Sequence, residues 1–250
     1  MVGITASLLA RPRVTAFVAV GAAVLAWFIV APHVGRLALW PAILLVSIVI
    51  IPGTLLLVLI ALPLWDRRWL FVAVALLALV ALLCTLLDRG LAANFAKMWA
   101  AVFAGWAFLR LFEQLSWVVL VAFIIPLVDI ISVYKGPTHT ITQHHFGVYT
   151  AVAIAFLVPG GGAAYLGPPD VLFYALFLGA AARWNLRVNW TWFATTFMYG
   201  FTVIMATAFD VGGLPALPFL SFGFLAANAD LLWRAMRPSA GSSESSPASS

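Results

Sequence analysis

The sequence predicts an all-helical polytopic membrane protein, and its composition and the distribution of its apolar residues are the grounds. Of the 250 residues, 65% are hydrophobic and 8% are charged, whereas about a quarter of a soluble domain is charged. The apolar residues form long unbroken runs, which favour helices over the alternating strands of a membrane barrel. This composition excludes a soluble enzyme, a disordered chain and a disulfide scaffold. The bilayer is the expected partner; the 13 basic residues are too scattered to predict nucleic-acid binding.

A helix needs about 20 apolar residues to cross a bilayer. We therefore predict a transmembrane domain over residues 1–237 with eight spans, at about 14–31, 39–62, 70–87, 92–110, 115–134, 168–184, 190–209 and 214–235. The Ser-rich segment 238–250 is predicted to be a disordered tail. The apolar segment 149–158 is too short to cross and ends at a Pro-Gly run, so a strand-like or re-entrant piece is expected there.

Basic residues predict the orientation, because they gather in cytoplasmic loops. With eight spans, one side has Arg11, Arg13, Arg67, Arg68, Arg110, Arg183, Arg187, Arg234 and Arg237, and the other has Arg36, Arg89, Lys97 and Lys135. Both termini are therefore expected in the cytoplasm. Arginine outnumbers lysine 11 to 2, which indicates a GC-rich prokaryote and hence its inner membrane.

Two aspartates are the candidate site residues. Asp129 lies inside an apolar span, three residues after Pro126, and an acid within a membrane span indicates function. Asp170 follows Gly167-Pro168-Pro169, which also suits an ordinary helix start. If segment 149–158 does not cross, both acids lie about 5–10 Å below the same membrane surface. We therefore expect them to face each other.

A pair of close carboxylates has a specific chemistry. Both cannot ionise cheaply, so they share a proton and titrate as a unit. One then acts as general base on a water while the other protonates a carbonyl. Peptide hydrolysis is one use of such a pair, and proton-coupled transport is another.

Three motifs in order resemble the presenilin and signal peptide peptidase family, the GxGD-type intramembrane aspartyl proteases. Asp129 with residues 132–137 (Ser-Val-Tyr-Lys-Gly-Pro) resembles the first aspartate motif. Residues 167–170 resemble the GxGD motif, and the Pro-Ala-Leu-Pro of residues 215–218 resembles the PAL motif that opens the last span. The resemblance covers about residues 92–235.

This resemblance implies a presenilin-like fold and a catalytic dyad of Asp129 and Asp170, with no cofactor and no metal. It implies that the substrates are single-span transmembrane segments or remnant signal peptides. Segment 149–158 would present a strand to an unwound substrate, and prolines in the PAL stretch would leave nearby carbonyls free to pair with it. The implied substrate-binding residues are Gly167, Pro215, Ala216 and Leu217. The sequence gives no indication of accessory subunits.

Two positions depart from the family pattern, and they keep alternatives open. Val128 stands where the family has tyrosine, and Pro169 where it has its second glycine. The family typically has nine spans, and eight are predicted here, oriented as in signal peptide peptidase. One alternative is an inactive relative that binds transmembrane helices, with Pro169 as the lesion. The other is a proton- or cation-coupled transporter or channel that uses the same acids.

The remaining polar residues are predicted to be structural. Asp210 ends a span and is expected to cap it. Asp230 stands four residues before Arg234, a spacing typical of a helix ion pair. The histidines of the 136–148 loop match no zinc spacing; they are His139, His144 and His145.

Overall fold

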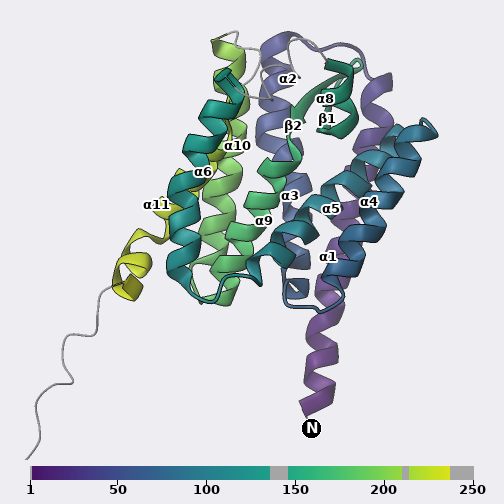
Figure 1. Ribbon diagram of the computed structural model, residues 1–250. Coiled ribbons are helices and arrows are strands. Elements are labelled where there is room, and N and C mark those ends of the chain that lie inside the picture. Colours follow the sequence, from purple (N-terminus) through teal and green to yellow (C-terminus); the bar gives the residue numbers. More distant parts are fainter. Residues whose placement is uncertain (1, 136–145, 210–213, 237–250) are drawn as a thin grey trace, which may run out of the picture.

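The computed structural model describes residues 2–135, 146–209 and 214–236 of the chain. Most of this part is helical, and two short strands form a small sheet (Figure 1). The prediction of a mostly helical chain with a strand-like segment is therefore confirmed. The tail 238–250, Asp210 and the three loop histidines lie outside the described residues.

The helices follow one another closely, and each predicted span overlaps a helix or, for 39–62, a continuous run of helices. In chain order they are α1 (Val2–Val30), η1 (Ala31–His33), α2 (Leu39–Leu45), η2 (Val46–Ile50), α3 (Ile51–Ala61), η3 (Leu62–Leu64), α4 (Leu70–Leu86), α5 (Gly90–Leu109), α6 (Leu115–Lys135), α8 (Phe146–Val152), α9 (Pro168–Arg183), α10 (Val188–Ala208) and α11 (Leu217–Met236).

Three helical stretches of the described chain are long and apolar enough to cross a membrane: Arg11–His33, Leu39–Leu64 and Leu115–Tyr134. Helix α4 is also apolar but shorter. Large apolar side chains on α1, α4 and α6 are exposed, including Val18, Leu76 and Leu127. Exposed apolar surface of this extent indicates contact with lipid or another protein. Eight crossings remain a prediction.

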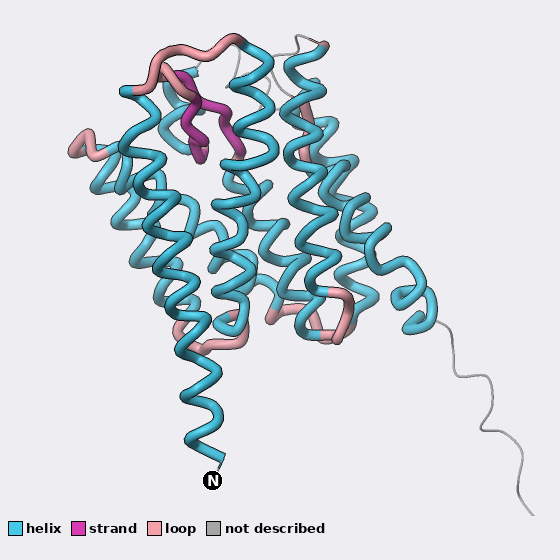
Figure 2. Tube along the Cα trace, turned by 180° about the vertical axis from the view of Figure 1, so that it is seen from behind, coloured by secondary structure: helices cyan, strands magenta, loops and turns pink. Residues whose placement is uncertain are grey.

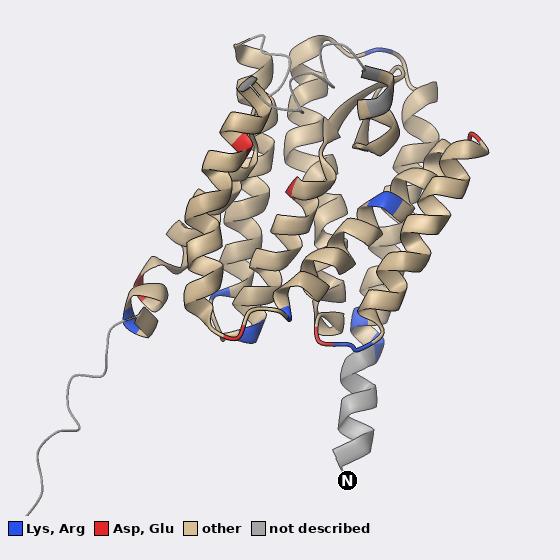
Figure 3. Ribbon diagram, viewed as in Figure 1, with Lys and Arg blue, Asp and Glu red and all other residues tan. Residues whose placement is uncertain are grey.

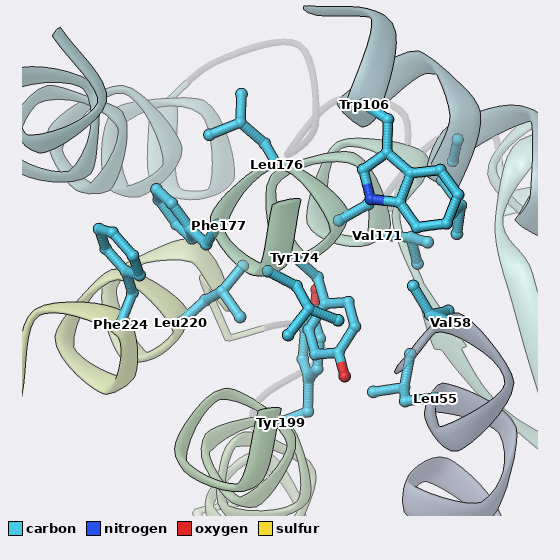
Figure 4. Packing of buried hydrophobic residues seen from close by; sticks show 14 of the residues in the cluster. Leu55, Val58, Trp106, Val171, Tyr174, Leu176, Phe177, Tyr199, Leu220 and Phe224 are labelled. Atoms are coloured by element: carbon cyan, nitrogen blue, oxygen red, sulfur yellow. The ribbon is translucent and has the colours of Figure 1, made fainter. Parts of the chain in front are cut away.

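Helix α9 is the innermost helix of the bundle, in contact with α5, α10, α11 and α6 (Figure 1). Val171 and every residue from 174 to 181 are buried. The approach of α5 is so close that a Cβ added at Gly105 would overlap the carbonyl oxygen of Leu172. On the other side, Phe177 stacks on Phe224 of α11 at 4.7 Å between ring centroids (Figure 4). This packing fixes the helix whose first turn contains Asp170.

An antiparallel hairpin precedes α9. Strand β1 (Ile154–Val158) pairs with β2 (Gly162–Leu166), and Val158 lies opposite Gly162. The connecting turn needs glycine, because Gly160 and Gly161 have φ angles of 85° and 92°. The prediction of a strand-like piece at 149–158 is thus confirmed only for the second half of the segment, because the first half belongs to the last turn of helix α8. The sequence prediction missed β2, although apolar runs on both sides of a Gly-rich turn are typical of a hairpin.

The described chain begins and ends at the same end of the bundle (Figure 1). Figure 2 shows the hairpin at the opposite end. Lysine and arginine gather mainly at the end where the chain begins and ends (Figure 3). This asymmetry agrees with the predicted distribution of basic residues, whereas the orientation in a membrane remains a prediction.

Candidate functional site

The first turn of α9 holds Asp170 by its own backbone. The Gly167 N–H donates to Asp170 Oδ2 at 2.9 Å, and the Asp170 N–H donates to the Gly167 carbonyl at 3.1 Å. Pro168 and Pro169 occupy the first two helical positions, where a missing N–H costs nothing because it has no partner within the helix. Pro169 is therefore compatible with the helix start. The carboxylate caps the helix, as an acid in a first turn does.

Gly167 has φ −68° and ψ 148°, an extended conformation open to any residue. The backbone conformation therefore does not require glycine. The space does, because a Cβ added at this position would lie 3.2 Å from Asp170 Oδ2. Such a contact is tighter than most real Cβ contacts, so the Asp170 carboxylate would have to give way. Gly167 thus leaves room for the Asp170 carboxylate, and its role in substrate binding remains a prediction.

Asp129 lies on α6, six residues before that helix ends, and is bonded to the start of α11. The Leu217 N–H donates to Asp129 Oδ2 at 3.0 Å. Leu217 is the first residue of α11, so its N–H has no partner within the helix and is available to a carboxylate. Pro215, Ala216 and Leu217 are all buried. This stretch therefore positions one of the two predicted acids.

The expectation that carbonyls near the prolines stay free is wrong for Ala216. Its carbonyl accepts the Leu220 N–H at 3.0 Å, as the first helical bond of α11. Pro218 lacks an N–H in the first turn of α11, where the N–H groups of a helix have no carbonyl partner within the helix in any case. What the PAL stretch offers is a backbone donor, the N–H of Leu217, rather than a free carbonyl at Ala216.

The two candidate acids come together between α6 and α9. These helices are in contact, and the carboxyl groups of Asp129 and Asp170 interact electrostatically. Both acids also interact with Tyr199 of α10. Segment 149–158 does not separate them, since it turns back in the hairpin. Two interacting carboxylates are suited to general acid and base catalysis, in which one is ionised and the other protonated.

Tyr149 of helix α8 lies near both Asp170 and the hairpin. Burial, and then the negative charge of Asp170, raise the pKa of the Tyr149 phenol to about 12. Tyr149 therefore remains protonated throughout the physiological pH range. Its ring lies 6.1 Å from that of Tyr165 on β2, edge to face. The hairpin, α8 and the first turn of α9 thus form one wall of the site.

The outer edge of β1 is occupied by helix side chains. Asn94 of α5 accepts the Ala155 N–H at 2.7 Å and donates to the Ala155 carbonyl at 3.0 Å. Trp27 of α1 donates to the Leu157 carbonyl at 3.1 Å. Alternate residues of an antiparallel strand bond to opposite sides. The backbone N–H and C=O groups of Ala155 and Leu157 point away from β2. Ala163 lies opposite Leu157, so its backbone N–H and C=O groups point to the outer edge of β2.

That outer edge has no further strand beside it in the described chain, because the sheet has two strands. The sequence prediction assigned the exposed strand to segment 149–158. In the described chain that segment's strand, β1, has its outer edge bonded to helix side chains, and the sheet has a second strand, β2, which that prediction missed. An open strand edge is suited to pair with an extended peptide.

Sequence reasoning also missed Tyr199 and the hairpin-holding Asn94. Asn94 had a signal, since it is a polar side chain within the apolar run 92–110. Tyr199 had none, because an aromatic residue in an apolar span is normally part of the core. Among the described residues no cluster of three or more His, Cys, Asp or Glu side chains could hold a metal ion.

The fold and site therefore define a mostly helical protein with membrane-length apolar helices and two interacting aspartates near one end of the bundle. Neither the protein-family models, nor the curated proteins, nor the solved structures compared with this chain give a match.

Proposed function

We propose that this protein is an intramembrane aspartyl endopeptidase that hydrolyses transmembrane segments of single-span proteins or remnant signal peptides. The observation that supports the proposal most is the meeting of Asp129 and Asp170 from two different helices. Acids within apolar helices are costly and are kept where they act. The protein is placed by this proposal in a prokaryotic inner membrane, with eight spans and both termini in the cytoplasm.

In the proposed reaction one aspartate is ionised and the other protonated. The ionised aspartate removes a proton from water as the water oxygen bonds to the scissile carbonyl carbon, and the second aspartate protonates the carbonyl oxygen. The carbon–nitrogen bond then breaks as the nitrogen takes a proton from the pair. The products are a carboxylic acid and an amine, and no acyl-enzyme forms. The chemistry needs no cofactor or metal.

The substrate would bind as an extended strand along the outer edge of β2, toward which the backbone N–H and C=O groups of Ala163 point. Unwinding the substrate is necessary, because the amides of an intact helix are bonded and shielded. The end of β2 leads directly into Gly167 and the first turn of α9. A peptide paired with this strand would therefore run toward Asp170.

The test is a cleavage assay with purified protein in liposomes. Single-span peptides of both orientations are offered to the wild type and to Asp129→Asn and Asp170→Asn, each of which keeps an amide oxygen as an acceptor. Asp88→Asn is the matched control, since Asp88 is an exposed loop residue with φ 54°, a conformation that asparagine also tolerates. We expect wild-type and control cleavage of peptides with a cytoplasmic N-terminus, and at least 10²-fold loss in both site variants.

Peptide binding without cleavage by the folded wild type would contradict the proposal. It would favour an inactive helix-binding relative, and Pro169→Gly would then be the next variant. Proton or cation flux that depends on both aspartates, without peptide products, would favour a transporter or channel.

A further inference from the structure

The hydroxyl of Tyr199 is buried without a hydrogen-bond partner among the described residues. It shares this property with Ser47 Oγ, Trp106 Nε1 and Ser221 Oγ. Buried polar atoms almost always have a partner, and each exception needs an explanation. Leaving such an atom unpaired costs about 1–3 kcal/mol of stability, so an unpaired buried hydroxyl is a candidate for a functional role.

The other three atoms are less informative about the site, because two are serine hydroxyls on helices and the third, Trp106 Nε1, lies away from the aspartates. Serine hydroxyls on helices can rotate toward a carbonyl of the preceding turn, so the hydroxyls of Ser47 and Ser221 are not fixed in direction as a phenol is. Trp106 packs against Gly179, which is nine residues, or about 13 Å along the helix axis, beyond Asp170. The Tyr199 hydroxyl is at the end of a rigid ring and does not reach its own backbone. Among the described residues it is thus the unpaired buried hydroxyl that neither its own backbone nor a neighbour satisfies and that lies near the aspartates.

Tyr174 provides a direct comparison. Its ring lies 5.7 Å from that of Tyr199, and both side chains are buried, at 0% and 1% exposure (Figure 4). The Tyr174 hydroxyl, however, is 3.1 Å from Thr196 Oγ1 and hydrogen-bonded to it. The two neighbouring phenols therefore differ in one respect: the Tyr174 hydroxyl has a hydrogen-bond partner in the described chain, and the Tyr199 hydroxyl has none there.

The position of Tyr199 is beside the aspartates. Tyr174 lies one helical turn after Asp170 on α9, on the same face, so the Tyr199 ring that packs against it at a tilt is near the first turn of that helix. Tyr199 also interacts electrostatically with both Asp170 and Asp129. It comes from α10, so the site is built by α6, α9, α10 and α11 together.

We propose that Tyr199 is a third catalytic residue, whose hydroxyl donates a hydrogen bond to the oxygen of the scissile carbonyl. This inference rests on the proposed function. As water adds, negative charge develops on that oxygen, and a donor already fixed in place stabilises it without reorganisation. Burial and packing against the Tyr174 ring supply the fixed position. The unpaired hydroxyl receives its acceptor when the substrate binds.

The test compares Tyr199→Phe with Tyr174→Phe in the liposome assay. For Tyr199→Phe we expect kcat to fall about 10²-fold, the effect of losing one such donor, with KM within about twofold of wild type. The melting temperature should stay equal or rise, since an unpaired buried hydroxyl is removed. Tyr174→Phe should lower the melting temperature, because it leaves Thr196 unpaired, and should lower kcat much less. Wild-type kcat in Tyr199→Phe, or parallel losses of stability and activity in both variants, would overturn the inference.

A second measurement does not depend on turnover. In the Asp129→Asn/Asp170→Asn double variant with ¹³Cζ-labelled tyrosine, a single-span Leu/Ala peptide is added, and its binding is measured separately. We expect the Tyr199 resonance to move on binding and that of Tyr174 to stay in place. An unmoved Tyr199 resonance in the peptide-bound protein overturns the inference while leaving the proposed function intact. Absence of both binding and wild-type cleavage overturns both proposals.

Discussion

Helices α9 and α6 present the two aspartates, and they are held very differently. In α9, Val171 and residues 174–181 are all buried. In α6, residues 123–134, the half that includes Asp129, contain no buried side chain. Asp170 is therefore part of a fixed scaffold, whereas Asp129 is on a peripheral helix. Its carboxylate is fastened to α11 by the Leu217 N–H.

Under the proposed function, this difference bears on where a substrate enters. A transmembrane segment that comes in beside α6 disturbs little packing, whereas one that comes in beside α9 has to displace the core. Regions with few buried contacts open at the lowest free energy. Substitutions in α9 and α6 should therefore change the free energy of unfolding by different amounts, which is measured by unfolding in detergent.

The largest effect is expected from Phe177→Ala on α9. The ring is fully buried and stacked on Phe224, at 4.7 Å and an interplanar angle of 8°. Its removal leaves a cavity, and we expect a loss of about 3 kcal/mol, the lower end for a buried Phe, because in apolar surroundings mainly packing is lost. The matched control is Leu127→Ala on α6, which is 61% exposed and should cost less than about 0.5 kcal/mol. If both variants lost the same free energy of unfolding, α6 would be packed as tightly as α9.

An intermediate effect is expected from Gly105→Ala, which tests the contact between α5 and α9. The added Cβ would overlap the Leu172 carbonyl oxygen, so the helices must move apart at a cost of about 1–3 kcal/mol. Gly53→Ala on α3 is the control, because nothing lies within 4 Å of its added Cβ. It should stabilise by up to about 1 kcal/mol through helix propensity. A neutral Gly105→Ala would mean that α9 is not tightly held.

The sequence predicted the helices well and the site only in part, for physical reasons. Long apolar runs specify helices by composition alone, so each predicted span overlaps helical structure. Asp129 stood out because an acid in an apolar helix is costly, whereas Asp170, which suits an ordinary helix start, was singled out by its expected depth beside Asp129 and by the family resemblance. The Leu217 N–H and the Tyr199 hydroxyl did not stand out, because a backbone donor has no sequence signal and a buried tyrosine resembles core.

Errors arose where partners are distant in the sequence. Strand β2 was missed, although the glycine run before it forms the hairpin turn. The expected pairing of Asp230 with Arg234 is wrong, because Asp230 bonds Arg187 with both oxygens at 2.8 Å. Local spacing favoured the neighbour on the same helix. The packing of α10 against α11 brought a better-oriented guanidinium from 43 residues away.

The smallest effect is expected from that same ion pair, which joins the start of α10 to α11 and so supports the helix that holds Asp129. The two side chains are 46% and 43% exposed, so solvent screens their attraction. A double-mutant cycle of Arg187→Ala and Asp230→Ala should give a coupling of about 0.5 kcal/mol, within the 0–1 kcal/mol of exposed pairs, and it should shrink in 1 M salt. Arg234→Ala with Asp230→Ala is the control cycle and should give none. A salt-insensitive coupling above about 2 kcal/mol would show a buried bond between α10 and α11. Asp129 would then be held through α11 as rigidly as Asp170 is held by α9, and the contrast between the two helices would disappear.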